Sequence, residues 1–250
     1  MDAFLVLILG LVVGSFLNAV IYRLHAGVSF VRGRSYCPHC KHDLSTWDLI
    51  PVFSFVMLRG KCRYCHKPIS WQYPLVELAT GLLLGLLWWK FGVSVQFFVY
   101  SVYTIFLIVM FVYDLRYYLI LDRVSIPAMV VSAILSIVVL RVAVIDLFIG
   151  AVIGGGFFYV QYIISRGKWI GGGDIRLGVV MGLMLGYPYI LIAFFIAYCC
   201  GSLVGIGLIV AHTKKWKSQV PFGTFLTAAT IISFFFGERI LEFYRGLIGL

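Results

Sequence analysis

Two closely spaced pairs of cysteines in the first third of the chain have the spacing of metal ligands. Two residues separate Cys37 from Cys40 and Cys62 from Cys65, and 21 residues lie between the pairs. A C-x-x-C turn can place two thiolates on one tetrahedral ion, and the second pair completes the site. The segment is too short and polar to bury a core, so a structural zinc ion would supply most of its folding free energy.

The same cysteines allow other interpretations. Two disulfides or a redox-active pair would show the same spacing. Three histidines lie beside the thiols: His39, His42 and His66. Because four thiolates already complete the coordination shell, we predict that these histidines are not metal ligands. A zinc ribbon could also bind nucleic acid. Membrane topology accounts for the basic residues of this segment, so we predict no nucleic acid partner.

A second set of candidate residues is acidic and borders apolar stretches. Asp114 ends one such stretch, and Asp174 begins another directly after Gly171, Gly172 and Gly173. Two carboxylates at one membrane depth can share a proton, because both cannot ionise cheaply at close range. One then activates water while the other protonates the carbonyl or the leaving amine, as in aspartic proteases. The glycines would interrupt the helix and let a substrate backbone approach.

Ordinary structural roles compete with this interpretation. Asp114 could pair with Arg116 or Arg123, and Asp174 could cap its helix. Asp122 follows Asp114 by eight residues and could replace it in the dyad. The remaining acids considered are Asp48 and Glu77, which flank the second half of the cysteine segment, and Asp146, which we expect to be interfacial.

Composition indicates the kind of protein that must position these residues. The chain has 250 residues, of which 62% are hydrophobic and 12% charged, and its mean hydropathy is +1.02. Soluble domains are about 45–50% apolar and about 25% charged. These values exclude an ordinary soluble enzyme, a disordered chain and a coiled coil. We therefore predict an all-α polytopic membrane protein.

Apolar stretches with few or no charged residues predict about eight transmembrane helices. They cover residues 3–22, 74–89, 95–113, 124–140, 147–165, a short sixth span at 174–186, a seventh ending near 211, and 220–237. The first span has no basic segment before it and no small-residue cleavage site after it, so we expect it to be retained. The sixth span is short enough to be re-entrant, which leaves a seven-span alternative open.

Lys and Arg divide unevenly between alternate loops. Of the twenty, sixteen fall on one side, including eight in residues 23–72. The positive-inside rule places that side in the cytoplasm and both termini outside. A reducing cytoplasm argues against disulfides in the cysteine segment. We therefore predict a first transmembrane helix at 1–22, a small cytoplasmic zinc-binding loop at 23–72, and a transmembrane peptidase helix bundle at 73–250.

Two further patterns have simple interpretations. Residues 150–156 are rich in glycine but follow no strand and lie within a span, so we predict close helix packing instead of a nucleotide-binding loop. Cys199 and Cys200 lie inside a span, and we expect them to be small packing residues.

Taken together, the motifs resemble those of the bacterial type IV prepilin peptidases, also called leader peptidase/N-methyltransferases. The resemblance covers nearly the whole chain. It rests on the two C-x-x-C pairs and on four further motifs: Gly14-Ser15-Phe16-Leu17-Asn18, Tyr73-Pro74-Leu75-Val76-Glu77, Gly171-Gly172-Gly173-Asp174 and Pro221-Phe222-Gly223. The third fits the GxGD motif that the family shares with presenilin-like intramembrane aspartyl proteases.

The resemblance implies two reactions at the bacterial inner membrane. One cleaves the basic leader of a type IV prepilin or pseudopilin precursor after a glycine, at the cytoplasmic face, for type IV pili or type II secretion. The other methylates the new amino terminus with S-adenosylmethionine, for which the chain has no Rossmann-type glycine loop. The chain departs from the family pattern at Leu49, Leu121, Arg176 and Thr224, and none of these positions is a predicted catalytic aspartate.

Three rival functions remain at this point. The chain could be a peptidase without methyltransferase activity. It could be a proton-coupled membrane transporter, although repeated halves and mid-membrane charges are then expected. It could also be a membrane scaffold without enzymatic activity, for which changing either Asp114 or Asp174 would not affect precursor processing.

Overall fold

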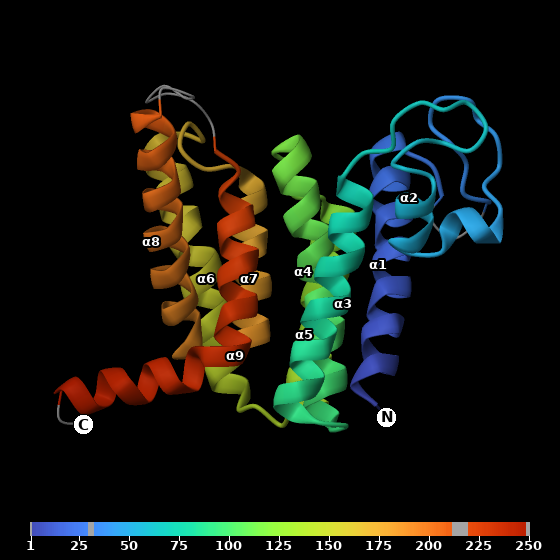
Figure 1. Cartoon of the computed structure of the whole chain (residues 1–250). Coiled ribbons are helices and arrows are strands. Elements are labelled where there is room, and N and C mark those ends of the chain that lie inside the picture. Colours follow the sequence, from blue (N-terminus) through green and yellow to red (C-terminus); the bar gives the residue numbers. More distant parts are fainter. Residues whose placement is uncertain (1, 30–32, 212–219, 249–250) are drawn as a thin grey trace. The chain divides into compact units, whose positions relative to one another are not determined.

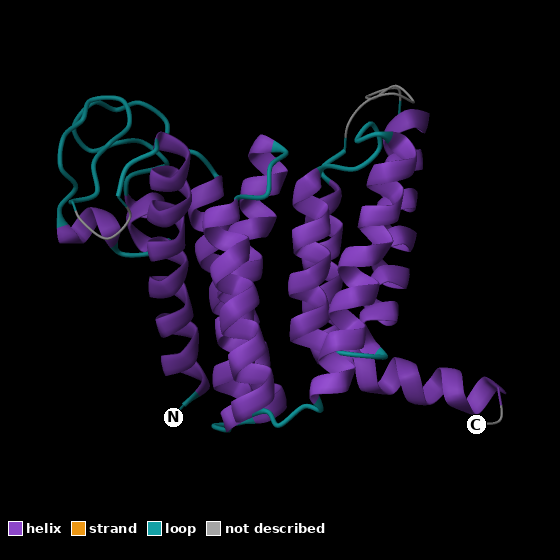
Figure 2. Cartoon of the chain, turned by 180° about the vertical axis from the view of Figure 1, so that it is seen from behind, coloured by secondary structure: helices purple, strands orange, loops and turns teal. Residues whose placement is uncertain are grey.

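A computed structural model of the chain describes residues 2–29, 33–211 and 220–248. Arg32 and the three lysines of the penultimate loop, Lys214, Lys215 and Lys217, lie outside the described residues. The described chain is helical without a named strand (Figures 1 and 2). Its α-helices are α1 (Ala3–Ala26), α2 (Phe53–Met57), α3 (Gln72–Phe91), α4 (Val95–Tyr117), α5 (Asp122–Ile134), α6 (Val144–Ser165), α7 (Gly172–Leu185), α8 (Tyr189–Val210) and α9 (Phe222–Ile248).

Most of these helices match the predicted spans. Within the described residues, seven are long and apolar enough to cross a membrane: α1, α3, α4, α5 with its extension to Val139, α6, α8 and α9. The predicted short sixth span is α7, whose 14 residues are about 21 Å long, less than the roughly 30 Å of a hydrocarbon core. The prediction of an all-α polytopic membrane protein is confirmed.

The chain divides into two compact units, residues 1–97 and 98–250. In the first unit, α1 and α3 pack with their backbones close together. A Cβ atom on Gly10 would lie 2.7 Å from the Gly81 Cα, and one on Gly14 would lie 2.7 Å from the Glu77 Cα. Small residues at a helix interface allow this approach, and any larger side chain would force the helices apart.

In the second unit, α6 and α7 pack through facing glycines. A Cβ atom on Gly154 would overlap the Gly178 carbonyl, and one on Gly150 would lie 2.8 Å from the Gly182 carbonyl oxygen. The prediction that residues 150–156 serve close helix packing is therefore confirmed. By contrast, Cys199 and Cys200 are both exposed on α8. Their predicted role as packing residues is wrong, because their side chains lie on the outer surface of that helix.

A buried polar contact holds the last turn of α7. The α5 helix continues into a π-helical turn, η2 (Leu135–Val139). Ser136 in this turn donates a hydrogen bond to the Leu183 carbonyl at 2.9 Å, and its hydroxyl lies 2.7 Å from that of Tyr103 on α4. The carbonyls of a final helical turn lack partners within their own helix. Ser136 therefore satisfies one of them and ties α7 to its neighbours.

Candidate active site and metal centre

The two C-x-x-C pairs fold into equivalent turns. The Cys37 N–H donates to the His42 carbonyl at 2.9 Å, and the Cys37 carbonyl accepts from the Lys41 N–H at 2.9 Å. The same two bonds recur at Cys62, with the same lengths. Lys41 and His66, each following the second cysteine of its pair, have positive φ angles of 61° and 56°. Each turn thus places its two thiols on one side of a tight loop.

The turns bring all four predicted thiols together. The sulfur atoms of Cys37, Cys40, Cys62 and Cys65 lie within 4.8 Å of one another. The distance from the Cys37 Sγ to the Cys65 Sγ is 3.9 Å. Zinc binds sulfur at about 2.3 Å, which gives a tetrahedral edge of about 3.8 Å. Donor type and spacing therefore fit a zinc ion, and among the described residues no histidine or carboxylate belongs to this cluster.

The electrostatics of the cluster favour a cation. Burial opposes ionisation of Cys37, but the N–H groups of Cys40 and His39 hold its pKa at about 7. At Cys65 the Lys67 N–H favours the thiolate and lowers the pKa. Desolvation and the neighbouring sulfurs outweigh this and raise the pKa of Cys65 to about 11. One thiolate thus discourages the ionisation of the next, as expected for like charges at close range. Four thiolates together need a compensating positive charge.

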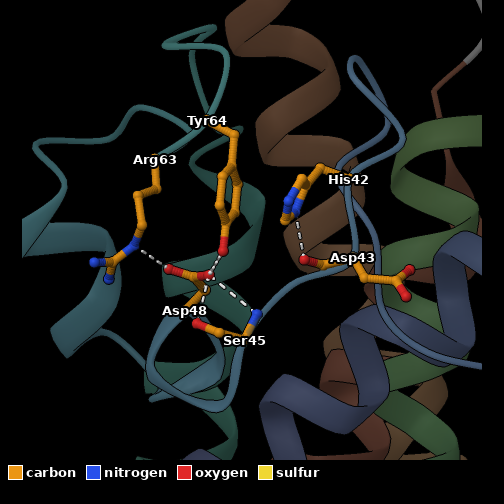
Figure 3. Close-up of polar contacts among 6 residues, drawn as sticks. All are labelled: His42, Asp43, Ser45, Asp48, Arg63 and Tyr64. Carbon is orange, nitrogen blue, oxygen red and sulfur yellow. Dashed lines mark hydrogen bonds and ion pairs between the residues drawn. The ribbon is translucent and has the colours of Figure 1, made fainter.

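Asp48 joins the segment after the first pair to the second pair (Figure 3). Its Oδ1 accepts a hydrogen bond from the Arg63 Nε at 2.7 Å. Its Oδ2 accepts from the Ser45 hydroxyl at 2.8 Å and from the Tyr64 hydroxyl at 3.2 Å. The Tyr64 ring also stacks on His42, with 3.6 Å between ring centroids. Asp48, whose side chain is only 3% exposed, is therefore a buried residue that holds the two halves of the cysteine segment together.

The charge on Asp48 stabilises this arrangement. Burial by itself would raise the pKa of the carboxyl, but hydrogen bonds from Ser45 and Arg63 together hold it below its ordinary value. A group whose pKa is depressed by folding stabilises the folded state above its unfolded pKa, about 3.9 for Asp. That stabilisation is lost only as the pH falls through the lower folded value. It is therefore complete at neutral pH, where the segment can be tested.

We expect Asp48→Ala to loosen residues 37–65 at pH 7. Losing hydrogen bonds to a buried charged group costs about 1–3 kcal/mol, or roughly 5- to 150-fold more frequent opening. Hydrogen exchange of the zinc-supplemented protein measures this directly. Asp43→Ala is the matched control, because its carboxylate is half-exposed, lies 3.8 Å from an exposed Arg34 and contributes little. Equal protection in the two variants would contradict the role given to Asp48.

Glu77 anchors the cysteine segment to the helix pair of the first unit. Its carboxylate is buried on α3 and accepts a hydrogen bond from the Val52 N–H at 2.7 Å. Val52 has a φ of 60°, which a β-branched residue rarely adopts. Nearby, Asn18 of α1 donates to the Tyr73 carbonyl at 3.0 Å and accepts from Gln72 at 3.2 Å. Asp48 and Glu77 thus have structural partners of their own.

In the second unit, Asp114 lies one turn before the end of α4. Its carboxylate caps the N-terminus of a different helix, α9. The residue is 6% exposed, and its Oδ2 accepts a hydrogen bond from the Thr224 N–H at 2.9 Å. This N–H belongs to the first turn of α9, where backbone donors lack helical partners and the helix dipole favours an anion. Gly223 permits the contact, because a Cβ atom there would lie 2.9 Å from the same oxygen.

Asp174 lies in the first turn of α7 and is half-buried. Its Oδ2 accepts a hydrogen bond from the Gly171 N–H at 3.2 Å. The capping role considered from sequence is therefore present, and it engages one of the two carboxylate oxygens. A Cβ atom on Gly172 would meet nothing within 4 Å, whereas one on Gly173 would lie 2.9 Å from the Cβ of Ile120. Backbone is thus accessible beside Asp174 at Gly172.

Ile120 links the surroundings of the two aspartates. It lies in the turn between α4 and α5, against Gly173 on one side and Gly223 on the other. Its Cδ1 would be 3.1 Å from a Cβ atom on Gly223, the residue that contacts the Asp114 carboxylate. Two acids 60 positions apart in sequence therefore have Ile120 in common beside their neighbouring glycines.

Asp122, the rival for the first position of the dyad, has another partner. It is exposed at the start of α5 and forms an ion pair with Arg176 of α7. This pair joins the first turns of the two helices, two residues after Asp174. Sequence reasoning did not identify this pair, or the contributions of Thr224 and Ile120. Only the glycine of the Pro221-Phe222-Gly223 motif pointed to that region.

Comparisons with known proteins identify the family of the chain. The family profile described as the bacterial peptidase A24 N-terminal domain matches residues 8–91, and that of the type IV leader peptidase family matches residues 101–206. No solved structure matches the chain.

Three relatives named prepilin leader peptidase/N-methyltransferase illustrate the similarity. The protein from Bacillus subtilis (strain 168) is 32% identical, with 95% of each chain covered. That from Stutzerimonas stutzeri is 31% identical, covering 95% of this chain and 92% of the relative. That from Xanthomonas campestris pv. campestris is 32% identical, covering 97% and 94%. With this identity over nearly the full length, the chain belongs to the type IV leader peptidase family.

Proposed function

We propose that this protein is a membrane aspartyl endopeptidase in which Asp114 and Asp174 form the catalytic dyad. Its substrate is a type IV prepilin or pseudopilin precursor, whose basic leader is cut after a glycine at the cytoplasmic face of the inner membrane. The observation that carries the proposal is that Ile120 lies against Gly173, the neighbour of Asp174, and against Gly223, which contacts the Asp114 carboxylate, while each carboxylate has one oxygen held by a backbone N–H. The names of the relatives support the substrate class.

The chemistry follows from a proton shared by two carboxyl groups. The ionised one takes a proton from water, which attacks the peptide carbonyl, while the protonated one donates to the carbonyl oxygen. Proton transfer to the amine then releases the leader. In each aspartate a hydrogen bond from a backbone N–H to Oδ2 orients the carboxyl group. The predicted substrate-approach loop of Gly171, Gly172 and Gly173 is the start of α7, where Gly172 offers backbone without a side chain to the substrate.

We also propose that the protein methylates the new amino terminus with S-adenosylmethionine. The support is the full-length similarity to relatives named as N-methyltransferases. A zinc ion held by Cys37, Cys40, Cys62 and Cys65 would be structural, because four thiolates leave no open coordination position. Residues 1–22 then serve as the first transmembrane helix, residues 23–72 as the cytoplasmic zinc-binding loop, and residues 73–250 as the peptidase bundle.

Mass spectrometry of one reaction tests both activities. The purified protein, in lipid, is incubated with a prepilin and S-adenosylmethionine, and the mass of the product is measured. We expect loss of the leader together with gain of one methyl group. Cleavage without addition of a methyl group would show that the protein is a peptidase without methyltransferase activity. An intact precursor, with proton uptake by vesicles containing the protein, would favour the transporter instead.

Topology is tested separately with reporters. We expect a reporter near Ser45 in the cysteine segment to be cytoplasmic and one near Gly92, between α3 and α4, to be external, because of the uneven distribution of Lys and Arg. A reporter near Lys215, outside the described residues, should be cytoplasmic if α7 crosses the membrane. An external Ser45 reporter would overturn the orientation, and an external Lys215 reporter would favour seven spans.

A further inference from the structure

The last part of α9 has a different residue pattern from the part before it. Four charged residues stand among five apolar ones in positions 238–247: Glu238, Arg239, Glu242 and Arg245 against Ile240, Leu241, Phe243, Tyr244 and Leu247. At about 100° per residue, the charged side chains occupy an arc of about 120° and the apolar ones an opposite arc of about 160°. Residues 238–247, here called the C-terminal segment, are thus an amphipathic helix.

The two parts of α9 differ in what covers them. Before the C-terminal segment, Leu226, Ala229 and Phe234 are buried in the second unit, and a Cβ atom on Gly237 would lie 3.2 Å from the ring of Tyr189. Within the segment three large apolar side chains are exposed: Phe243 to 71%, Tyr244 to 58% and Leu247 to 69%. Both Figure 1 and Figure 2 show the end of α9 leaving α6 and α8 and running across the end of that helix group.

Length places the change of direction at a membrane surface. Residues 222–237 form about 24 Å of helix, close to the roughly 30 Å of a hydrocarbon core. All 27 residues of α9 would measure about 40 Å, which is more than a straight span requires. The chain therefore reaches the boundary of the bilayer near Gly237. An exposed apolar face that continues from a membrane-spanning helix at this depth has lipid as its neighbour.

We propose that the C-terminal segment lies in the headgroup region of the bilayer, with Phe243 and Leu247 directed into the acyl chains. Its two acidic and two basic residues cancel, so burial of apolar surface and not attraction to anionic lipid holds it there. The other end of α9 carries the Thr224 N–H that binds Asp114. The segment therefore fixes the depth of that helix, and through it the depth of the Asp114 contact.

A depth scan of the full chain in lipid nanodiscs tests this placement without any assay of activity. A nitroxide amino acid is introduced singly at each of positions 238–247, and collisions with oxygen and with a soluble nickel chelate are measured. We expect oxygen contact to peak at 243 and 247 and nickel contact to peak at 238, 242 and 245. The pattern should be the same in neutral and anionic lipid.

Paired variants supply the control. Phe243→Ser with Leu247→Ser should lower the oxygen-to-nickel ratio of a label at position 244 several-fold, whereas Glu242→Ser with Arg245→Ser should leave it nearly unchanged. High nickel contact at all positions would place the segment in water, and uniform oxygen contact would place it across the membrane. Low contact with both reagents at 243 and 247 would show that protein covers the apolar face. Each of these three results would overturn the proposal.

Discussion

Asp114→Asn and Asp174→Asn should each abolish leader cleavage while the protein still inserts and folds. The amide oxygen of asparagine can still accept the hydrogen bond from Thr224 or Gly171, so the backbone contacts survive. What is lost is the exchange of a proton between two carboxyl groups, and general acid–base catalysis contributes about 10²- to 10⁴-fold to a rate. We therefore expect cleavage to fall by at least about 100-fold in each variant. The measurement is the initial rate of prepilin processing in lipid.

Asp122→Asn is the control for this expectation. It removes a carboxylate at the same end of the helices, but one that is exposed and paired with Arg176. Exposed ion pairs contribute about 0–1 kcal/mol, so the rate should change only a few-fold. If Asp122→Asn is as inactive as Asp114→Asn, the first acid of the dyad has been misassigned. Near-normal processing by either dyad variant would remove that residue from the mechanism.

Zinc should be present at one ion per chain and should fall sharply in Cys37→Ser and in Cys62→Ser. Each change removes a thiolate from a cluster whose sulfur atoms lie within 4.8 Å of one another. Because metal binding supplies most of the folding free energy of so small a segment, residues 37–65 should loosen as the ion is lost. Metal analysis of the purified variants, with hydrogen exchange of this segment, measures both effects.

The same variants separate the two reactions. Asp114 and Asp174 lie in the second unit, whereas the cysteine segment lies in the first, so cleavage should suffer less than in the aspartate variants. Methyl transfer should suffer more, if the cysteine segment supports that reaction. Cys199→Ser is the matched control, since its thiol is exposed on α8 and outside the cluster, and it should keep zinc and both activities. Wild-type protein without zinc, with Cys37 and Cys40 oxidised in cells, would make the cluster a redox element.

The sequence by itself determined the class of protein and which four cysteines form the candidate metal centre. A composition with 62% hydrophobic residues is far from that of a soluble domain, and apolar stretches of about 20 residues satisfy their backbone polar groups in lipid by forming helices. The C-x-x-C spacing places two sulfur atoms within reach of one ion through local geometry alone. Both properties depend on neighbours in sequence, and for that reason they can be predicted from it.

Only the tertiary structure decided the partners of the acids. Asp114 is 110 residues from the Thr224 N–H that it binds, and no local pattern records that distance. Asp122 stands eight residues from Asp114 and could replace it as far as the sequence shows, and in the structure it pairs with Arg176. Asp48 and Glu77 are likewise plain acids in the sequence but structural supports in the fold. A carboxylate interacts with whatever donor lies within a few ångströms, and helix packing determines which donor that is.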